Sequence, residues 1–209
     1  VPPAQRGAIA EALGDDVEHV EQPDPLGTGN ALASALLADS HGLKNILLAN
    51  GDAPLLQGDT VAELAALHTA RASTVTILVA CIPAARATDL GRVKRGARGK
   101  PLAIVEAPRD GSGHGDESTD HVVDVNAGLY AFDADWLRGA ITQLKPHESG
   151  QFHVVDLVGL AVAEGRRVEA LTQPALDEPL GVNTRVQLAA AETAMQTRLR
   201  QRWLGAGVT

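Results

Sequence analysis

The chain has 209 residues, enough for one large domain, and its hydrophobic fraction of 44% is ordinary for a globular protein. Its net charge of −8 argues against non-specific nucleic-acid binding, and its aromatic fraction of 2% argues against base-stacking platforms. No apolar run reaches the roughly 18 residues that span a bilayer, and no secretory leader opens the chain. We expect a single domain over residues 1–209, with no nucleic-acid or membrane partner.

The single cysteine, Cys81, has no partner for an internal disulfide and lies in an apolar run. Free cysteine behaves as a small hydrophobic residue, so we expect a buried structural thiol. This cysteine usage favours a reducing, cytoplasmic setting.

The first half of the chain alternates helical and strand-like patterns. "PAQRGAIAEALG" predicts a helix closed by Gly14, and "DVEHVEQ" predicts a short strand. The apolar spacing after Thr28 predicts a helix through Asp39 that Thr28 caps. "KNILLAN" predicts a strand buried on both faces, "DTVAELAALHTARA" a helix with an Asp or Thr cap, and "STVTILVACI" a β-branched strand.

In the second half, a Gly-rich basic segment and a polar loop come first, and the alternation of strands and helices then resumes. "GRVKRGARGKPLAIVEA" predicts two short strands around a Gly-rich basic turn, and "PRDGSGHGDESTD" predicts a mobile loop. "VVDVNAGLYAF" and "RVEALTQ" predict strands. Three helices are expected: "DADWLRGAITQL" capped by Asp133, "QFHVVDLVGLAVAEG" ended by Gly165, and a long closing helix from "TRVQLAAAETAM" onward. The pattern predicts an α/β fold: a Rossmann-like mixed, mainly parallel sheet with helices on both faces.

A candidate metal ligand follows one of these strands. "LLANGDAPLL" places Asn50, Gly51 and Asp52 at the carboxyl end of an apolar strand, where open α/β sheets bind ligands. A charged aspartate there is costly without a partner, and Mg²⁺ prefers carboxylates together with phosphate oxygens. The alternative is a turn aspartate that bonds local backbone.

Other polar residues also stand at strand ends or helix starts, and each has a structural alternative. Asn183 in "EPLGVNTR" is either a ligand or a helix N-cap, and Glu106 in "IVEA" either a ligand or a plain edge carboxylate. Asn126, inside an apolar strand, needs hydrogen bonds from a ligand or from a neighbouring loop. The turn "LGTGNA" is either punctuation before a helix or a set of backbone N–H groups and a hydroxyl held out for a ligand.

In this order, the motifs "QPDPLGTGNA", "NGDAPLL", "LGRV", "IVEA", "VNAGLY", "GQFHVVDL" and "GVNTR" resemble one known family. It is the uridyltransferase domain of the bacterial bifunctional N-acetylglucosamine-1-phosphate uridyltransferase / glucosamine-1-phosphate acetyltransferase, in the sugar-nucleotidyltransferase superfamily. The resemblance extends from about Val17 to Thr209. It implies the fold of the nucleotide-diphospho-sugar transferases.

The resemblance also implies roles for individual residues. Uracil and the nucleotide would be held by Gln22, Gly27, Thr28, Asn50 and Gly51. Mg²⁺ would be held by Asp52 and Asn183, which are the residues most directly involved in catalysis. The acetamido sugar would be bordered by Gly91, Glu106, Asn126 and His153.

The implied reaction joins UTP and N-acetylglucosamine 1-phosphate into UDP-N-acetylglucosamine, a peptidoglycan precursor, with release of pyrophosphate. Catalysis of this kind is mostly positioning and charge neutralisation. The family begins with a Gly-rich phosphate loop, and this sequence starts beyond it at Val1-Pro2-Pro3. We therefore expect a domain that is incomplete at its amino terminus and impaired in activity. A missing amino-terminal segment or a full-length homo-oligomer is the partner we expect to complete it.

Smaller departures affect the sugar side. His153 stands where the family has a sugar-contacting tyrosine, and it either bonds a sugar hydroxyl or is a solvated residue at a helix start. Asn50 stands where the family has a tyrosine before the Gly-Asp pair. The family also has a lysine close after the glutamate of its "IVE" motif, where this chain continues with "APRD". Two alternatives to uridylyl transfer stay open: a non-catalytic nucleotide-sugar-binding module, and a nucleotidyltransferase for another sugar 1-phosphate.

Overall fold

The computed structural model describes residues 5–14, 17–39, 42–96, 99–107, 121–174 and 181–208. Within them the helices are α1 (Arg6–Leu13), α2 (Thr28–Ala38), α3 (Gly58–Arg71), α4 (Ala134–Ala140), α5 (Asp156–Ala163) and α6 (Arg185–Gly205). The strands are β1 (Asn45–Ala49), β2 (Val75–Pro83), β3 (Arg92–Arg95), β4 (Pro101–Val105), β5 (Val122–Asp133) and β6 (Val168–Pro174). The loop predicted over "PRDGSGHGDESTD" lies outside the described residues.

These strands form one mixed sheet in the order β4-β3-β5-β2-β6, and β1 also pairs with β5. The partners β1, β2 and β3 are each antiparallel to β5, whereas β6 is parallel to β2. Four strands, β1, β2, β3 and β6, therefore share one direction, but only β2 and β6 are parallel neighbours, because the reversed β5 separates the others. The mixed Rossmann-like sheet is confirmed, with more antiparallel pairing than the sequence suggested.

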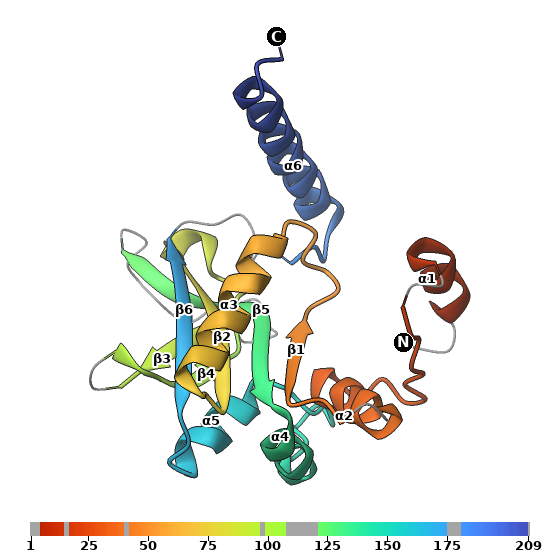
Figure 1. Ribbon diagram of the computed structural model, residues 1–209, viewed down its shortest axis with the longest axis vertical. Coiled ribbons are helices and arrows are strands. Elements are labelled where there is room, and N and C mark those ends of the chain that lie inside the picture. Colours follow the sequence, from red (N-terminus) through yellow and green to blue (C-terminus); the bar gives the residue numbers. More distant parts are fainter. Residues whose placement is uncertain are drawn as a thin grey trace.

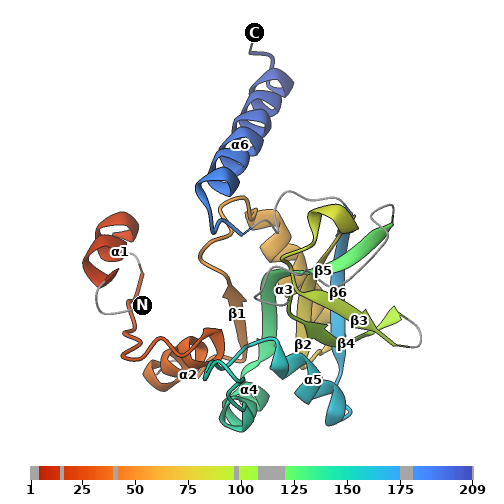
Figure 2. The same ribbon diagram turned by 180° about the vertical axis from the view of Figure 1, so that it is seen from behind.

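Helices cover both faces of the sheet, as predicted (Figures 1 and 2). On one face Leu64 of α3 packs against Leu78 of β2 and Leu129 of β5. On the other face Ile77 and Phe132 join side chains of α4 and α5 in the larger core cluster. Successive strand residues point to opposite faces, so β2 and β5 supply both cores with alternating apolar residues.

A register shift interrupts the pairing of β2 with β5 next to the cavities described below. Ile77 pairs with Tyr130, but Val79 pairs with Asn126 instead of Gly128. Gly128 has a φ of +70°, a conformation that favours glycine. Such irregularities re-aim side chains beside functional sites, and this one leaves Gly128 without a partner on β2 and sets Asn126 opposite Val79.

One strand prediction near the amino-terminal end is wrong, and another is right about the strand but wrong about its burial. Residues 17–22 form no strand, because no described strand lies alongside to pair with their backbone. The strand β1 forms but is not buried on both faces: it pairs only with β5 among the described strands, and Leu47 is 46% exposed.

Helix ends show both where local sequence signals predict the structure and where they do not. Gly14 follows α1 with a φ of 71°, and the Asp133 carboxylate accepts a hydrogen bond from the Trp136 backbone N–H at 2.8 Å, as predicted. The N-cap of α2 is Gly27 rather than Thr28, and the N-cap of α3 is Gln57 rather than an Asp or Thr. The helix predicted from Gln151 begins only at Asp156.

The Cys81 thiol is half-buried and donates a hydrogen bond to Asp124 at 2.9 Å. Burial, with the hydrogen bond and charge of Asp124 adding to it, raises the pKa of this thiol to about 11. The thiol is therefore protonated at neutral pH and poorly nucleophilic, which fits the structural role expected for it. In the described part of the chain, no helix has the length and apolar character needed to cross a membrane.

Candidate functional site

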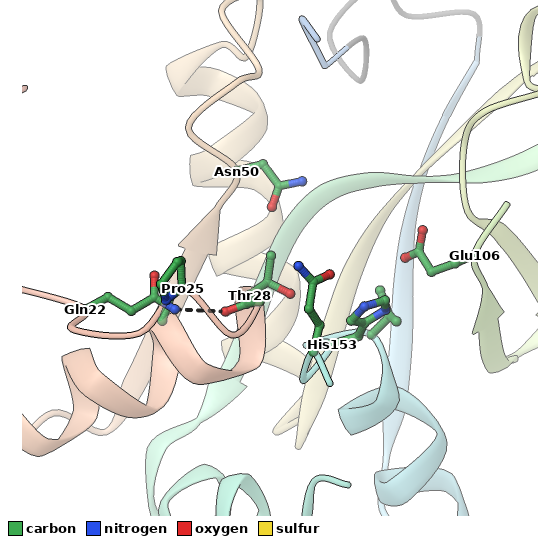
Figure 3. A pocket seen from close by; sticks show the side chains of 10 residues that line it. Gln22, Pro25, Thr28, Asn50, Glu106 and His153 are labelled. Carbon is green, nitrogen blue, oxygen red and sulfur yellow. Dashed lines mark hydrogen bonds between the residues drawn. The ribbon is translucent and has the colours of Figure 1, made fainter. Parts of the chain in front are cut away.

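All predicted site residues but one line two cavities that share Asn50 and Glu106 in their walls, and Figure 3 shows the larger of the two. The larger cavity has a volume of about 500 Å³ and is lined by Gln22, Pro25, Gly27, Thr28, Ala31, Asn50, Glu106, Gln151, His153 and Val155. The smaller has about 210 Å³ and is lined by Asn50, Asp52, Ala53, Asp89, Leu90, Gly91, Glu106, Asn126, Ala127, Gly128, Gly181 and Asn183. Segments far apart in the sequence thus surround two adjacent cavities.

The carboxyl end of β1 forms the junction between the two cavities. The Asn50 backbone N–H, directly after β1, donates to the Gly128 carbonyl at 3.0 Å. A Cβ added at Gly128 would lie 2.5 Å from Nδ2 of Asn50, so only glycine allows this close approach. The irregular part of β5 therefore fixes how the loop after β1 enters the site.

The proposed metal ligands come together at the smaller cavity. The backbone N–H of Val182 donates to the Asp52 carbonyl at 2.8 Å, which joins the loop after β1 to the segment before α6. Both Asp52 and Asn183 line this cavity. Asp52 is exposed, so the expected cost of burying its charge does not apply. Asn183 is not the helix cap, because Thr184 is the N-cap of α6.

The turn before α2 is built around a buried amide. Gln22 is 7% exposed, and its Nε2 donates to the Asn30 Oδ1 at 2.6 Å and to the Gly27 carbonyl at 3.2 Å. Gly27 has a φ of 95°, and a Cβ added there would lie 2.6 Å from the Phe152 carbonyl oxygen. The turn is thus more than punctuation, since it is shaped to approach another chain segment closely.

The segment around Phe152 is fastened to this turn by three hydrogen bonds. The Phe152 N–H donates to the Leu26 carbonyl at 2.8 Å, and the Gly29 N–H donates to the Phe152 carbonyl at 2.8 Å. The Thr28 hydroxyl accepts from the Val154 N–H at 3.1 Å, so it holds a distant segment instead of capping its own helix. These bonds set the wall of the larger cavity that carries His153.

Asn126 is held by its own strand. Its Nδ2 donates to the Tyr130 hydroxyl at 2.6 Å, and its Oδ1 accepts from the Gly128 N–H at 3.2 Å. Burial, with a smaller contribution from the charge of Glu106, raises the pKa of Tyr130. Groups of its own strand, and not of a neighbouring loop, therefore use part of the hydrogen-bonding capacity of Asn126, and the side chain also lines the smaller cavity.

On the sugar side, Gly91 and Glu106 are neighbours. A Cβ at Gly91 would lie 3.3 Å from both carboxylate oxygens of Glu106. His153 lies in the wall of the larger cavity and stacks on His147 with a ring-centroid distance of 4.2 Å. The Nε2 of His147 lies 2.7 Å from an Asp156 carboxylate oxygen. His153 is therefore a supported side chain of the cavity wall and not a solvated helix-start residue.

Of the predicted site residues, only Gly51 lines neither cavity, although it stands between Asn50 and Asp52, which do. The sequence reading also missed several residues of the walls, of which Asp89 and Gly181 carry the clearest signal. Asp89 precedes Gly91 in the "LGRV" region, and Gly181 precedes Asn183 in "GVNTR". Both could have been found as neighbours of a predicted residue.

The charge of the site is negative. Asp52, Asp89 and Glu106 line the smaller cavity, and no lysine or arginine stands among the described residues that line either cavity. Carboxylate and amide oxygens suit Mg²⁺, which keeps waters and phosphate oxygens as further ligands. The residues described contain no cluster of three or more His, Cys, Asp or Glu that would enclose a metal by itself. The donor set therefore fits an ion that shares its coordination with a phosphorylated ligand.

The chain belongs to the nucleotidyl transferase family, whose model matches residues 6–181. A solved structure of CMP:2-keto-3-deoxy-manno-octonic acid synthetase complexed with CTP has a TM-score of 0.65 and 19% identity to this chain. It matches 94% of this chain and 78% of that one. This likeness supports the fold.

More similar sequences carry the name bifunctional protein GlmU. The protein from Shouchella clausii (strain KSM-K16) is 35% identical over 206 residues, which cover 96% of this chain and 43% of the relative. The one from Exiguobacterium sp. (strain ATCC BAA-1283 / AT1b) is 38% identical over 205 residues, covering 97% and 44%. That from Corynebacterium efficiens is 37% identical over 202 residues, covering 96% and 40%. The chain thus spans less than half the length of these relatives, and the predicted resemblance to the uridyltransferase domain is confirmed.

Proposed function

We propose that this chain transfers a uridylyl group from UTP to N-acetylglucosamine 1-phosphate, with Mg²⁺ held by Asp52 and Asn183. The observation that carries the proposal is the pair of adjacent cavities, whose shared walls bring the residues predicted for base, metal and sugar near one another. The similarity to bifunctional GlmU proteins over nearly all of this chain supports the same reaction. The product would serve cell-wall precursor synthesis.

The reaction is an in-line displacement that needs no protein nucleophile. A phosphate oxygen of the sugar 1-phosphate attacks the α-phosphorus of UTP, the bond to the β-phosphate oxygen breaks, and pyrophosphate leaves. The chain's own part is positioning: Gln22, Gly27 and Thr28 hold the base, while Glu106 and Asn126 orient the sugar. Bound Mg²⁺ would neutralise phosphate charge between them.

The metal role predicts a specific effect of Asp52→Asn. Pyrophosphate release from UTP and N-acetylglucosamine 1-phosphate should fall by roughly 100-fold, because a metal ion supplies several kcal/mol of charge stabilisation. Asp59→Asn, on the exposed first turn of α3, is the matched control and should leave the rate unchanged. Equal rates in Asp52→Asn and the unmodified chain would refute the metal role.

A second candidate, a binding module without catalysis, is favoured by one observation: carboxylates but no basic side chains line the described cavities, so nothing there opposes triphosphate charge. Titration with UDP-N-acetylglucosamine beside the pyrophosphate assay separates the two. Binding without pyrophosphate release supports the module. Glucose 1-phosphate in the same assay tests a different sugar preference, because Asn126 and Glu106 would lose the acetamido group as a partner.

A further inference from the structure

The buried amide of Gln22 has its two hydrogen-bond donors occupied by protein acceptors. The bond to the Asn30 Oδ1 is 2.6 Å long, and the bond to the Gly27 carbonyl is 3.2 Å long. Figure 3 shows the Gln22 nitrogen at the dashed hydrogen bond and its oxygen directed away from it. No hydrogen bond from the described residues reaches that oxygen, so the amide offers a ligand an acceptor and no donor.

The orientation of this amide is not reversible without cost. A flipped Gln22 would bring its oxygen against the Gly27 carbonyl oxygen, which is backbone and cannot change into a donor. The shorter hydrogen bond to Asn30 also holds the Gln22 side chain in this orientation, because without that bond one buried N–H of Gln22 would have no partner. Asn30 does not line the larger cavity, so it acts only through Gln22.

We propose that Asn30 is a positioning residue that makes the larger cavity select uracil over cytosine. This inference rests on the proposed function, because it assigns the base to the cavity that Gln22 lines. Uracil carries a ring N–H at position 3, which donates to a carbonyl oxygen. Cytosine carries a lone pair there, which the same oxygen repels. A site built to bond one group discriminates strongly against an analogue that leaves its polar atom unpaired.

Binding of UDP and CDP, measured by calorimetry with Mg²⁺ present, tests the selectivity. The unmodified chain should bind UDP more tightly. Asn30→Leu should reduce the ratio of UDP to CDP affinity by about tenfold or more, because Gln22 then loses the shorter of the two hydrogen bonds that fix its amide and no longer holds its oxygen toward the base. Asn30→Asp keeps an acceptor at this position and should retain the ratio. Ser34→Ala, one turn further along α2, removes a hydroxyl bonded to the Asn30 carbonyl and serves as the control.

The side-chain amide resonances of Gln22, assigned with Gln22→Ala, provide a readout that needs no ligand. They should be protected from solvent exchange in the unmodified chain and in Asn30→Asp, and lose that protection in Asn30→Leu. Unchanged resonances in Asn30→Leu, or changed resonances with an unchanged nucleotide ratio, would overturn the proposal. A chain that binds neither nucleotide refutes the proposed function and the base selectivity together, while the resonances still decide whether Asn30 positions Gln22.

Discussion

At the residue scale, Tyr130 is fully buried, and its hydroxyl holds the side chain of Asn126, which lines the smaller cavity. It is 1% exposed and accepts the hydrogen bond of Asn126 Nδ2 at 2.6 Å. Because burial raises its pKa above the ordinary value, the phenol is protonated and neutral at neutral pH. Its ring also stacks with Phe132, so the hydroxyl is held by core packing.

Replacing Tyr130 by Phe should keep the ring packing and remove only this hydrogen bond. We expect the free energy of unfolding to fall by about 1 kcal/mol, since the amide of Asn126 loses a partner, and UDP-N-acetylglucosamine to bind more weakly. Chemical denaturation and calorimetry measure the two effects. In an Asn126→Ala background the same substitution should cost clearly less, and an equal cost in both backgrounds would contradict the coupling.

His68 is a buried histidine outside the candidate site. It is 2% exposed on α3, and its Nδ1 lies 2.9 Å from the Thr76 hydroxyl oxygen on β2. Burial lowers the pKa of His68 below its ordinary value of 6.5, and the charge of Asp133 opposes this effect only partly. The folded chain therefore binds this proton more weakly than the unfolded chain does.

The pH dependence of stability follows from that difference. Well above pH 6.5 His68 is neutral in both states, and as the pH falls through 6.5 the unfolded chain takes up the proton first, so the protein loses stability. His68→Gln should remove this part of the loss between pH 7 and 5, measured by denaturation at each pH. The exposed His121→Gln is the control, and a slope that is the same in both variants would contradict the assignment.

At the scale of elements, the start of α6 is tied to the site by one side chain. The Gln187 Oε1 accepts from the backbone N–H of Asn183 at 2.8 Å and of Thr184 at 2.9 Å. Its Nε2 donates to Asp89 at 3.3 Å, and the Thr184 hydroxyl completes a capping box. This single residue therefore holds one proposed metal ligand, Asn183, against another wall of the smaller cavity.

Gln187→Ala should loosen Asn183 without touching the cavity itself. We expect UDP-N-acetylglucosamine binding in the presence of Mg²⁺ to weaken, and stability to fall by about 1 kcal/mol, as for the loss of a helix cap. Gln196→Ala, exposed on the same helix, should change neither quantity. Isothermal titration measures the binding and chemical denaturation the stability of both variants. Equal values for Gln187→Ala and Gln196→Ala would contradict the role of Gln187 in positioning Asn183.

At the scale of the whole molecule, the helices and strands differ widely in how much of each is buried. The central strands β2 and β5 are buried along most of their length, whereas α1 has no buried residue and α6 has only Ala191. In both overall views α6 extends away from the sheet (Figures 1 and 2). The bond from Arg198 to the Leu55 carbonyl at 2.9 Å fastens its middle to the body.

Hydrogen exchange should therefore follow a gradient. Amides of β2 and β5 should exchange most slowly, at rates set by global unfolding, and those of α1 and of α6 beyond Arg198 should exchange fastest. Arg198→Ala should extend the fast region of α6 toward its start while leaving β2 unchanged. Mass spectrometry of exchanged peptides measures this, and uniform protection across α6 and the sheet would contradict it.

The sequence by itself determined the elements with strong local signals and part of the lining of the two cavities. Continuous β-branched runs made β2 predictable, the Asp133 cap fixed the start of α4, and the ordered motifs supplied half of the residues that line the two cavities as predicted site residues. These signals are local, since propensities, caps and residue types are written within a few neighbouring positions.

Only the tertiary structure decided how those residues meet. The exposed face of β1, the register shift that sets Asn126 opposite Val79, and the bond between Thr28 and Val154 depend on which segments become neighbours. Thr28 matched a helix cap locally, yet its hydroxyl bonds a residue 126 positions away. Asn30 carried no local signal at all, because its importance comes from the buried amide beside it. Burial and hydrogen-bond partners are properties of the packed chain, and no window of sequence contains them.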